Sequence, residues 1–306
     1  MTVHFHINAA QTQLNSVIMG KPKIIQLALI GLLAQGHLLI EDQPGVGKTL
    51  LATSLAYCLG LQTARIQFTS DLMPSDITGM QIYRKDCEQF EFRQGPLFNQ
   101  VLLADEINRA PSKSQSALLQ AMEERIVSID GNQYALPQPF FVIATQNPLS
   151  QIGTFPLPES QLDRFLMCLS IGLPNANAER QLLAGISPRE YLLSLRPHCD
   201  TAIVIAAQTQ VAAIHLSDTV LDYLQQLIAA TRNHLALSQG LSPRGAQALA
   251  ISSKACAWLD GRDYVILDDV QTVWTAVTAH RVTTKNNIYL DAITICQNIL
   301  NDTPLS

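Results

Sequence analysis

The stretch IEDQPGVGKTLLA, residues 40–52, determines how the chain must fold around it. It matches most of the pattern G-x-x-x-x-G-K-[ST], in which a glycine-rich loop joins a strand to a helix. Gly47, Lys48 and Thr49 supply the second half of the pattern, while Asp42 stands where the first glycine belongs. The apolar run HLLIED precedes the loop and the helical run TLLATSLAYCLG follows it. Because this is the required context, we predict a phosphate-binding loop rather than a chance turn with a stray lysine.

Each residue type in such a loop has its own task. Backbone N–H groups of the turn and of the helix N-terminus surround the phosphates. Lys48 reaches the outer phosphates, and the hydroxyl of Thr49 binds Mg²⁺. A carboxylate at Asp42 that pointed at the phosphates would repel them, but one that pointed away would cost little, so we expect a working site. The residues predicted to bind the nucleotide here are Pro44, Gly45, Val46, Gly47, Lys48, Thr49 and Leu50.

A second motif, VLLADE, follows at residues 101–106. It is a continuous apolar strand that ends in two acids. Asp105 is placed to hold Mg²⁺, directly or through water, and Glu106 is placed to act as the general base that polarises the attacking water. Alone, this motif could equally be an acidic strand end at the surface. After a phosphate-binding loop, it indicates the metal and base carboxylates of an ATPase.

The first half of the chain alternates apolar strands with helices. Continuous apolar strands between helices indicate a parallel sheet that is covered on both faces, so we predict an α/β fold. The runs that we predict as its strands cover residues 37–42, 63–68, 101–106, 139–147 and 166–171.

The pattern changes after Gly172. Helical periodicity then dominates, so we expect an α/β domain over residues 1–172 and a helical domain over residues 173–306. Ser242 as N-cap and Pro243 at the first helical position begin one of its helices. The three clearest helical segments are 218–230, 242–261 and 268–282.

The bulk composition narrows the class of protein. Hydrophobic residues make up 47% of the 306 and charged residues 15%, which is enough apolar material for a full core and excludes a disordered chain. The net charge of −5 makes nucleic-acid binding an unlikely role. Apolar runs are too short to span a membrane, and the N-terminus lacks the features of a secretory signal. No two of the six cysteines form a C-x-x-C pair, so we expect a cytoplasmic protein.

Three further polar residues are candidates for the same chemistry. Asn147 ends an apolar strand, where its amide could orient the lytic water, although it could also be a turn residue. Arg164 precedes the last strand, and its alternative role is a salt bridge to Asp163 or Glu159. Arg244 lies in the first turn of a helix, where a cation opposes the helix dipole; this mild penalty suggests a function.

Taken in order, these blocks resemble the MoxR family of AAA+ ATPases. The resemblance covers most of residues 15–285 and is most specific at 101–124, whereas 175–215 carries little of it. The blocks that carry it are DLMPSDITG (71–79), GPLF (95–98), VLLADEINRAPSKSQSALLQAMEE (101–124), ATQNP (144–148), LPESQLDRF (157–165), LSPRG (241–245) and GRDYVILDDV (261–270).

The resemblance implies a role for each matching residue. Lys48 and Thr49 correspond to the Walker A motif, and Asp105 and Glu106 to Walker B. The remaining three candidates correspond to sensor 1 (Asn147), the arginine finger that reaches the nucleotide of the neighbouring subunit (Arg164) and sensor 2 of the lid (Arg244). Family members usually have glycine in place of Asp42.

The resemblance also implies an architecture and partners. The expected fold is a P-loop AAA+ core with a parallel five-stranded sheet in the order 5-1-4-3-2, followed by a C-terminal all-α lid. Subunits of this kind form homo-oligomeric rings, typically hexamers, that use ATP and Mg²⁺ to remodel, mature or insert metal into a protein client, such as one with a von Willebrand factor A domain. Residues 80–93 and 125–136 correspond to two inserted hairpins that point toward the pore or the client.

Two other classes of function fit parts of the sequence. A nucleotide-gated scaffold would bind ATP and barely hydrolyse it, but the presence of Glu106, Asn147 and Arg164 argues against this. A nucleic-acid motor would share the same loop, but the acidic balance and the lack of an appended DNA-binding module argue against it.

Overall fold

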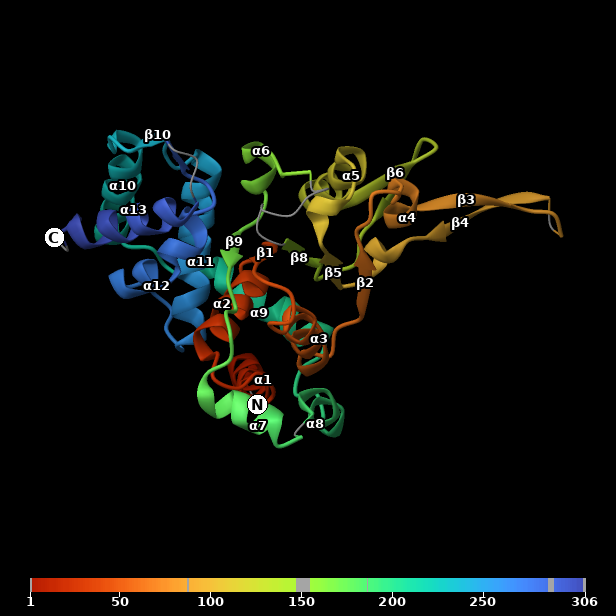
Figure 1. Ribbon diagram of the computed structural model, residues 1–306, viewed down its shortest axis with the longest axis horizontal. Coiled ribbons are helices and arrows are strands. Elements are labelled where there is room, and N and C mark those ends of the chain that lie inside the picture. Colours follow the sequence, from red (N-terminus) through yellow and green to blue (C-terminus); the bar gives the residue numbers. More distant parts are fainter. Residues whose placement is uncertain (1, 87, 147–154, 186, 286–288, 305–306) are drawn as a thin grey trace.

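The computed structural model describes residues 2–86, 88–146, 155–185, 187–285 and 289–304 (Figure 1). Its centre is a parallel sheet of five strands in the order β2-β5-β8-β1-β9. Numbered one to five along the chain, these strands read 2-3-4-1-5, so the predicted order 5-1-4-3-2 is confirmed from the opposite edge. The strands are β1 (Leu38–Glu41), β2 (Thr63–Gln67), β5 (Val101–Asp105), β8 (Phe141–Gln146) and β9 (Met167–Leu169).

Both faces of the sheet are buried at its central strands, which explains why β1, β5 and β8 are largely apolar without alternation, whereas the edge strand β2 alternates and exposes one face. Successive side chains point to opposite faces, so Ile143 of β8 joins one hydrophobic cluster while Val142 and Ala144 join the other. The first cluster contains residues of α1, α2, α3 and α9, and the second contains residues of α4 and α5. These helices are α1 (Val3–Val17), α2 (Pro22–Leu33), α3 (Lys48–Cys58), α4 (Pro74–Thr78), α5 (Ser112–Glu124) and α9 (Thr201–Ala213).

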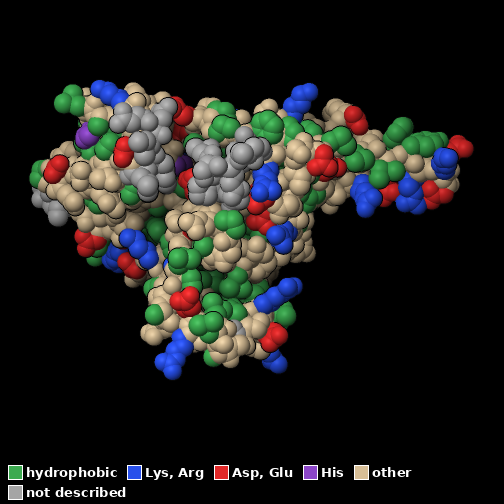
Figure 2. Space-filling view, in the orientation of Figure 1, with side chains coloured by type: hydrophobic (Ala, Val, Ile, Leu, Met, Phe, Trp, Pro, Cys, Tyr) green, Lys and Arg blue, Asp and Glu red, His purple; other side chains and the backbone are tan. Residues whose placement is uncertain are grey.

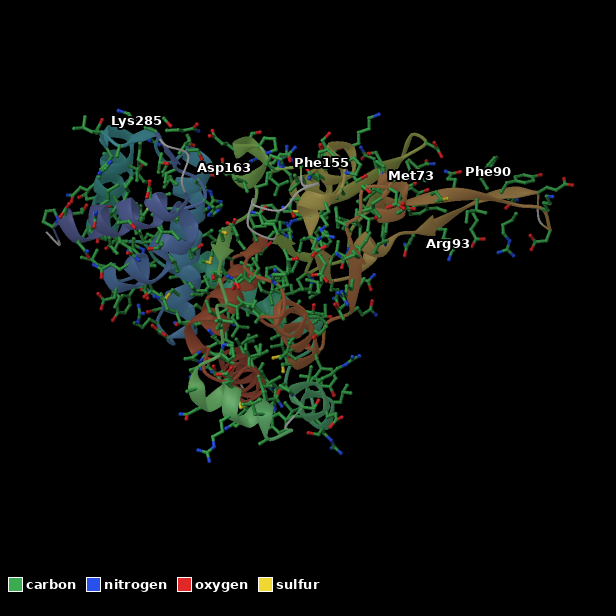
Figure 3. All side chains as sticks on the ribbon, in the orientation of Figure 1. Met73, Phe90, Arg93, Phe155, Asp163 and Lys285 are labelled. Carbon is green, nitrogen blue, oxygen red and sulfur yellow. The ribbon has the colours of Figure 1, made fainter. Side chains whose placement is uncertain are left out.

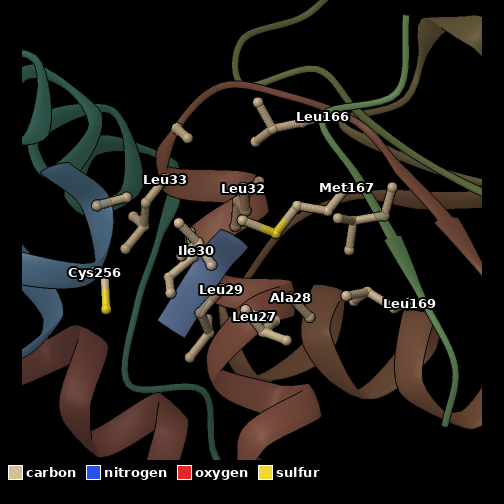
Figure 4. Close-up of a cluster of buried hydrophobic side chains, with 14 of the residues drawn as sticks. Leu27, Ala28, Leu29, Ile30, Leu32, Leu33, Leu166, Met167, Leu169 and Cys256 are labelled. Carbon is tan, nitrogen blue, oxygen red and sulfur yellow. The ribbon is translucent and has the colours of Figure 1, made fainter. Parts of the chain in front are cut away.

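Helix α2 is apolar around most of its circumference because it is covered on several sides. Ile30 and Leu33 belong to one cluster with Met167 of β9 and with Cys256 of α11 (Pro243–Leu259) (Figure 4). A helix that is hydrophobic all round is typical of such an interior position. The first domain and the helical domain therefore share one continuous core.

The helical domain consists mainly of α10, α11, α12 and α13. Ser242 caps α11 as predicted, because its side chain accepts a hydrogen bond from the backbone N–H of Gly245 at 3.0 Å. The structure adds one departure from an all-helical lid, a short antiparallel pair between β10 (Leu237–Gln239) and β11 (Thr283–Thr284). The other three helices are α10 (Asp218–Asn233), α12 (Leu267–Thr278) and α13 (Tyr289–Asp302).

Residues 173–213, at the start of the domain predicted to be helical, form helices whose bounds the sequence patterns did not give. They are α7 (Ala176–Leu183), α8 (Pro188–Ser194) and α9, and α8 and α9 pack against α1 (Figure 1). Helix α9 also contacts α11. We propose that 173–213 connects the domains while lying on the α/β core, and that the lid itself begins at α10.

Two hairpins extend from the face that carries α5. The first, β3 (Gly79–Arg84) with β4 (Gln89–Gln94), projects far from the body of the molecule and carries exposed apolar side chains, among them Phe90 (Figures 1, 2 and 3). The second is β6 (Ile126–Ile129) with β7 (Asn132–Ala135). Both coincide with the hairpins expected at 80–93 and 125–136. Among the described residues, none of the helices has the length and apolar character needed to cross a bilayer.

Candidate functional site

The phosphate loop lies between β1 and α3 and is shaped by two glycines. Gly45 and Gly47 have φ angles of +86° and +98°, a region that side chains rarely adopt. A Cβ placed on either would have no heavy atom within 4 Å, so the backbone here faces open space. Lys48 follows as the first residue of α3, and its Nζ donates a hydrogen bond to the carbonyl of Asp42 at 2.6 Å. The loop is thus an open cradle of backbone with one lysine at its inner end.

Electrostatics connect this lysine to the second motif. Burial lowers the pKa of Lys48, and the negative charges of Asp42, Asp105 and Glu106 oppose that effect. These carboxylates lie close enough to affect Lys48 because the carboxyl ends of parallel strands meet at one edge of the sheet. The fold therefore brings the phosphate loop and the two acids together, as predicted.

Asp105 is buried at the end of β5 and is held by two neighbouring strands. Its carboxylate forms an ion pair with Arg65 of β2, with 2.6 Å between Nε and Oδ2. From β8, the hydroxyl of Thr145 lies 3.3 Å from the other carboxylate oxygen. These contacts fix the orientation of the carboxylate that we predict to bind Mg²⁺.

Glu106 is held in a strained backbone conformation. Its φ of +57° lies in the left-handed region, which costs a residue with a side chain about 1 kcal/mol or more. Its N–H donates to Thr145 Oγ1 at 2.9 Å, which helps to offset this cost. Its carboxylate accepts from Gln67 Nε2 at 2.9 Å and pairs with Arg109 Nε at 3.0 Å. The predicted general base is therefore engaged by its own chain in this structure.

Arg65, Gln67 and Thr145 were not among the predicted site residues. The signal that could have identified two of them is local: in TARIQF, Arg65 and Gln67 are two residues apart and so share one face of β2. Their closeness to the acids depends on the register between β2 and β5, in which Gln67 is paired with Asp105. That register is not readable from the sequence.

A cavity of about 300 Å³ adjoins the phosphate loop. One wall is Gly45 to Gly47 with Leu50, and another includes Ile171, Gly172 and Pro174. Its third side comes from the turn after α1. Since this lining is largely apolar and borders the phosphate cradle, it could hold the nucleoside half of a nucleotide.

Arg164 and Arg244 meet elsewhere, around one carboxylate. Arg164 follows the short helix α6 (Glu159–Leu162), and its Nη1 lies 2.9 Å from Glu123 Oε2. Arg244, in the first turn of α11, pairs with the other oxygen of Glu123. Arg164 thus forms a salt bridge within its own chain, as its alternative role required, but with Glu123 instead of the partners considered: Asp163 pairs with Arg281 and Glu159 accepts a hydrogen bond from Thr283.

The two arginines line a cavity of about 380 Å³ at the junction of core and lid. No residue of the phosphate loop is among its lining residues. Likewise, neither arginine lines the cavity beside Gly45 and Gly47. The sequence candidates thus form two clusters, and the roles of Arg164 and Arg244 stay predictions. Asn147 lies outside the described residues.

Comparisons with known proteins agree with this arrangement. Residues 37–167 match the model of the ATPase family associated with various cellular activities (AAA), and residues 229–292 match the AAA lid domain. Chaperone MoxR1 of Mycobacterium tuberculosis is 39% identical, over 92% of this chain and 76% of that protein. Protein MoxR of Paracoccus denitrificans is 33% identical, over 91% and 89%.

A solved structure is similar over the whole fold. It is that of a candidate ATPase from Cytophaga hutchinsonii, with a TM-score of 0.90 and 33% identity over 99% of this chain and 95% of that one. Among sequences, the YeaC protein of Bacillus subtilis is 44% identical over 92% of this chain and 88% of its own length. With both nucleotide motifs in place on an AAA core and lid, the chain belongs to the MoxR family of AAA ATPases, which hydrolyse ATP and act as chaperones.

Proposed function

We propose that this ATPase works as a homo-oligomeric ring that hydrolyses Mg²⁺-bound ATP at the phosphate loop and uses the energy to remodel a protein client. The observation that carries this proposal is the convergence of Lys48, Asp105 and Glu106 at one edge of the sheet. A cation at a helix start beside two strand-end carboxylates is the arrangement that phosphoryl transfer to water needs.

The residues present fit both nucleotide and metal. The open backbone at Gly45 and Gly47 leaves room for phosphate oxygens. Thr49 and Asp105 offer the hydroxyl and carboxylate oxygens that Mg²⁺ prefers, and the ion would neutralise charge on the phosphates. Lys48 holds the outer phosphates, and because its ammonium has three N–H donors it can do so while it still donates to the carbonyl of Asp42.

Glu106 acts as the general base on the attacking water. Its contacts with Gln67 and Arg109 are both to Oε2, and the carboxylate must present an oxygen to that water in order to accept its proton. The backbone of Glu106 stays in place, because its N–H is bound to Thr145. Asn147 completes this proposal as the residue that orients the water.

The two-arginine cluster supports a ring. Since Arg164 and Arg244 lie apart from the cradle of their own chain, we infer that they serve the nucleotide of the neighbouring subunit. There they would neutralise charge that develops on the phosphoryl group. A hexamer is the ring size that the family resemblance favours.

The client is a protein, as the name of the chaperone MoxR1 suggests for that relative. The projecting β3–β4 hairpin, with the exposed side chains of Tyr83 and Phe90, offers an apolar surface for it. We propose maturation or metal insertion of a client with a von Willebrand factor A domain, in the cytoplasm. The five cysteines in the described part of the chain are buried, and none is in a disulfide, which suits a reducing compartment.

Phosphate release under steady-state conditions, with MgATP and a candidate client, tests the function. Lys48→Ala should not bind ATP, while Glu106→Gln should bind it with normal affinity and hydrolyse it at least a hundredfold more slowly, since an amide cannot accept the proton. Lys113→Ala and Glu124→Gln change exposed residues of α5 in the same way and serve as matched controls. Wild-type turnover in Glu106→Gln would show that Glu106 is not the base. Tight binding with negligible wild-type turnover would instead indicate the nucleotide-gated scaffold.

A further inference from the structure

Asp42, which replaces the first glycine of the phosphate-loop pattern, uses all of its polar groups. Its N–H donates to the carbonyl of Gln146 at 3.3 Å, and its own carbonyl accepts from Lys48. Carboxylate Oδ1 accepts from the N–H of Gln43 at 2.9 Å. Oδ2 accepts from the N–H of Gly172 at 2.7 Å and from the hydroxyl of Ser170 at 3.1 Å. A glycine here could make only the first two of these contacts.

The contacts of Oδ2 join two segments that are far apart in the sequence. The parallel pairing of β1 with β9 ends at Ile40 and Leu169. Beyond that point the Asp42 carboxylate links the two segments, because it accepts hydrogen bonds from residues that follow β9. The Asp42 side chain therefore holds the phosphate loop to the chain that follows β9, beyond the last backbone pairing between β1 and β9.

Both fastened segments are walls of the cavity beside the phosphate loop. Gly45 to Gly47 form one wall, and Gly172, which donates to Asp42, is part of the other. The turn at Gly172 is held by a second contact as well, since Lys21 Nζ donates to the carbonyl of Leu173 at 2.7 Å. The spacing between the phosphate cradle and the nucleoside wall thus depends on the Asp42 carboxylate.

We propose that Asp42 is a positioning residue that couples the phosphate cradle to the nucleoside pocket. The carboxylate accepts hydrogen bonds from Gly172 and Ser170 after β9 and from Gln43 in the loop, so it sets the geometry between these two segments. This inference rests on the proposed function, because it concerns the same nucleotide site. It implies that loss of the carboxylate weakens ligands that span both walls and spares ligands that occupy the cradle alone.

The test compares ATP and ADP with inorganic triphosphate, which has no nucleoside, by calorimetric titration in Mg²⁺. For Asp42→Ala we expect ATP and ADP to bind about five- to tenfold more weakly, because hydrogen bonds to a charged acceptor are lost. Triphosphate should bind within about twofold of wild type. Asp42→Asn keeps one acceptor oxygen, so its affinity for ATP and ADP should lie between those of Asp42→Ala and wild type. Ser170→Ala removes one donor outside the loop, so it should weaken ATP binding by about twofold. This variant remains informative if Asp42→Ala folds poorly.

The outcomes separate this inference from the function it rests on. Tighter binding of both ligands by Asp42→Ala would mean that the carboxylate repels phosphate, and equal weakening of both would mean that it shapes the cradle alone. Either result overturns the coupling role while wild-type ATP binding stands. If the wild-type protein binds neither ATP nor triphosphate, the proposed nucleotide site itself is wrong.

Discussion

Arg281, just after α12, should be the most costly arginine of the lid to replace. Its side chain is 2% exposed, and its Nε lies 2.7 Å from Asp163 Oδ1. The guanidinium also donates to the carbonyls of Leu166 at 2.8 Å and Phe165 at 2.6 Å, which lie just before β9. Asp163, marked in Figure 3, accepts in addition from Ser242, the N-cap of α11. One buried cation therefore joins two lid helices to the edge of the sheet.

We expect Arg281→Met to lower the free energy of unfolding by about 3–5 kcal/mol, because it leaves the Asp163 carboxylate and buried carbonyls without their donor. Arg244→Met is the matched control in the same domain. Its ion pair with Glu123 is exposed by 45% and 41%, so water already screens it and the loss should be about 1 kcal/mol or less.

Urea unfolding measures both changes. With an m-value of about 3 kcal/mol/M, the midpoint of Arg281→Met should fall by about 1 to 1.7 M, and that of Arg244→Met by about 0.3 M or less. Both tryptophans, Trp258 and Trp274, are buried in the lid, so their fluorescence reports its unfolding, while circular dichroism follows the whole chain. Equal midpoint shifts for the two variants would refute the reasoning that burial of the Arg281 ion pair determines its contribution.

Two further predictions concern pH and assembly. His37 is buried between the N–H of Val142 and the carbonyl of Met122, and burial, the largest cause, lowers its pKa from 6.5 to about 4. The unfolded chain binds a proton at this histidine below pH 6.5, whereas the folded chain excludes it. The free energy of unfolding should therefore fall by about 1.4 kcal/mol per pH unit as pH falls from 6.5 toward 4. Measured by urea unfolding, the free energy of His37→Gln should depend less steeply on pH, and parallel pH curves for the two proteins would contradict this. Arg164→Ala should bind ATP normally yet hydrolyse it about 10³-fold more slowly. Mixing it with Glu106→Gln should restore part of the ATPase rate, because some subunit interfaces would then pair an intact arginine with an intact base. An ATPase rate that stays flat across mixing ratios, with subunit exchange verified, would exclude action in trans.

Most of the fold could be predicted from local patterns in the sequence. The strand-loop-helix around Gly47 and Lys48 and the apolar strands of the sheet could be predicted because each depends on residues close together in the chain. Helix α1 was missed although Ile7, Leu14 and Val17 are buried on one side of it, because polar residues interrupt the pattern. Helix α9 was missed for the opposite reason, since its run TAIVIAAQTQVAA is apolar on nearly all sides and shows little periodic contrast.

The tertiary structure decided which distant side chains meet. The sequence determined that Asp42 breaks the glycine pattern, but only the pairing of β1 with β9 brings Gly172 within reach of its carboxylate. In the same way, the sequence marked Arg164 and Arg244 as candidates, and only the docking of the lid on the core brings both to Glu123. Residue type and local spacing determine what a side chain can do, whereas strand register and domain packing determine the partner on which it acts.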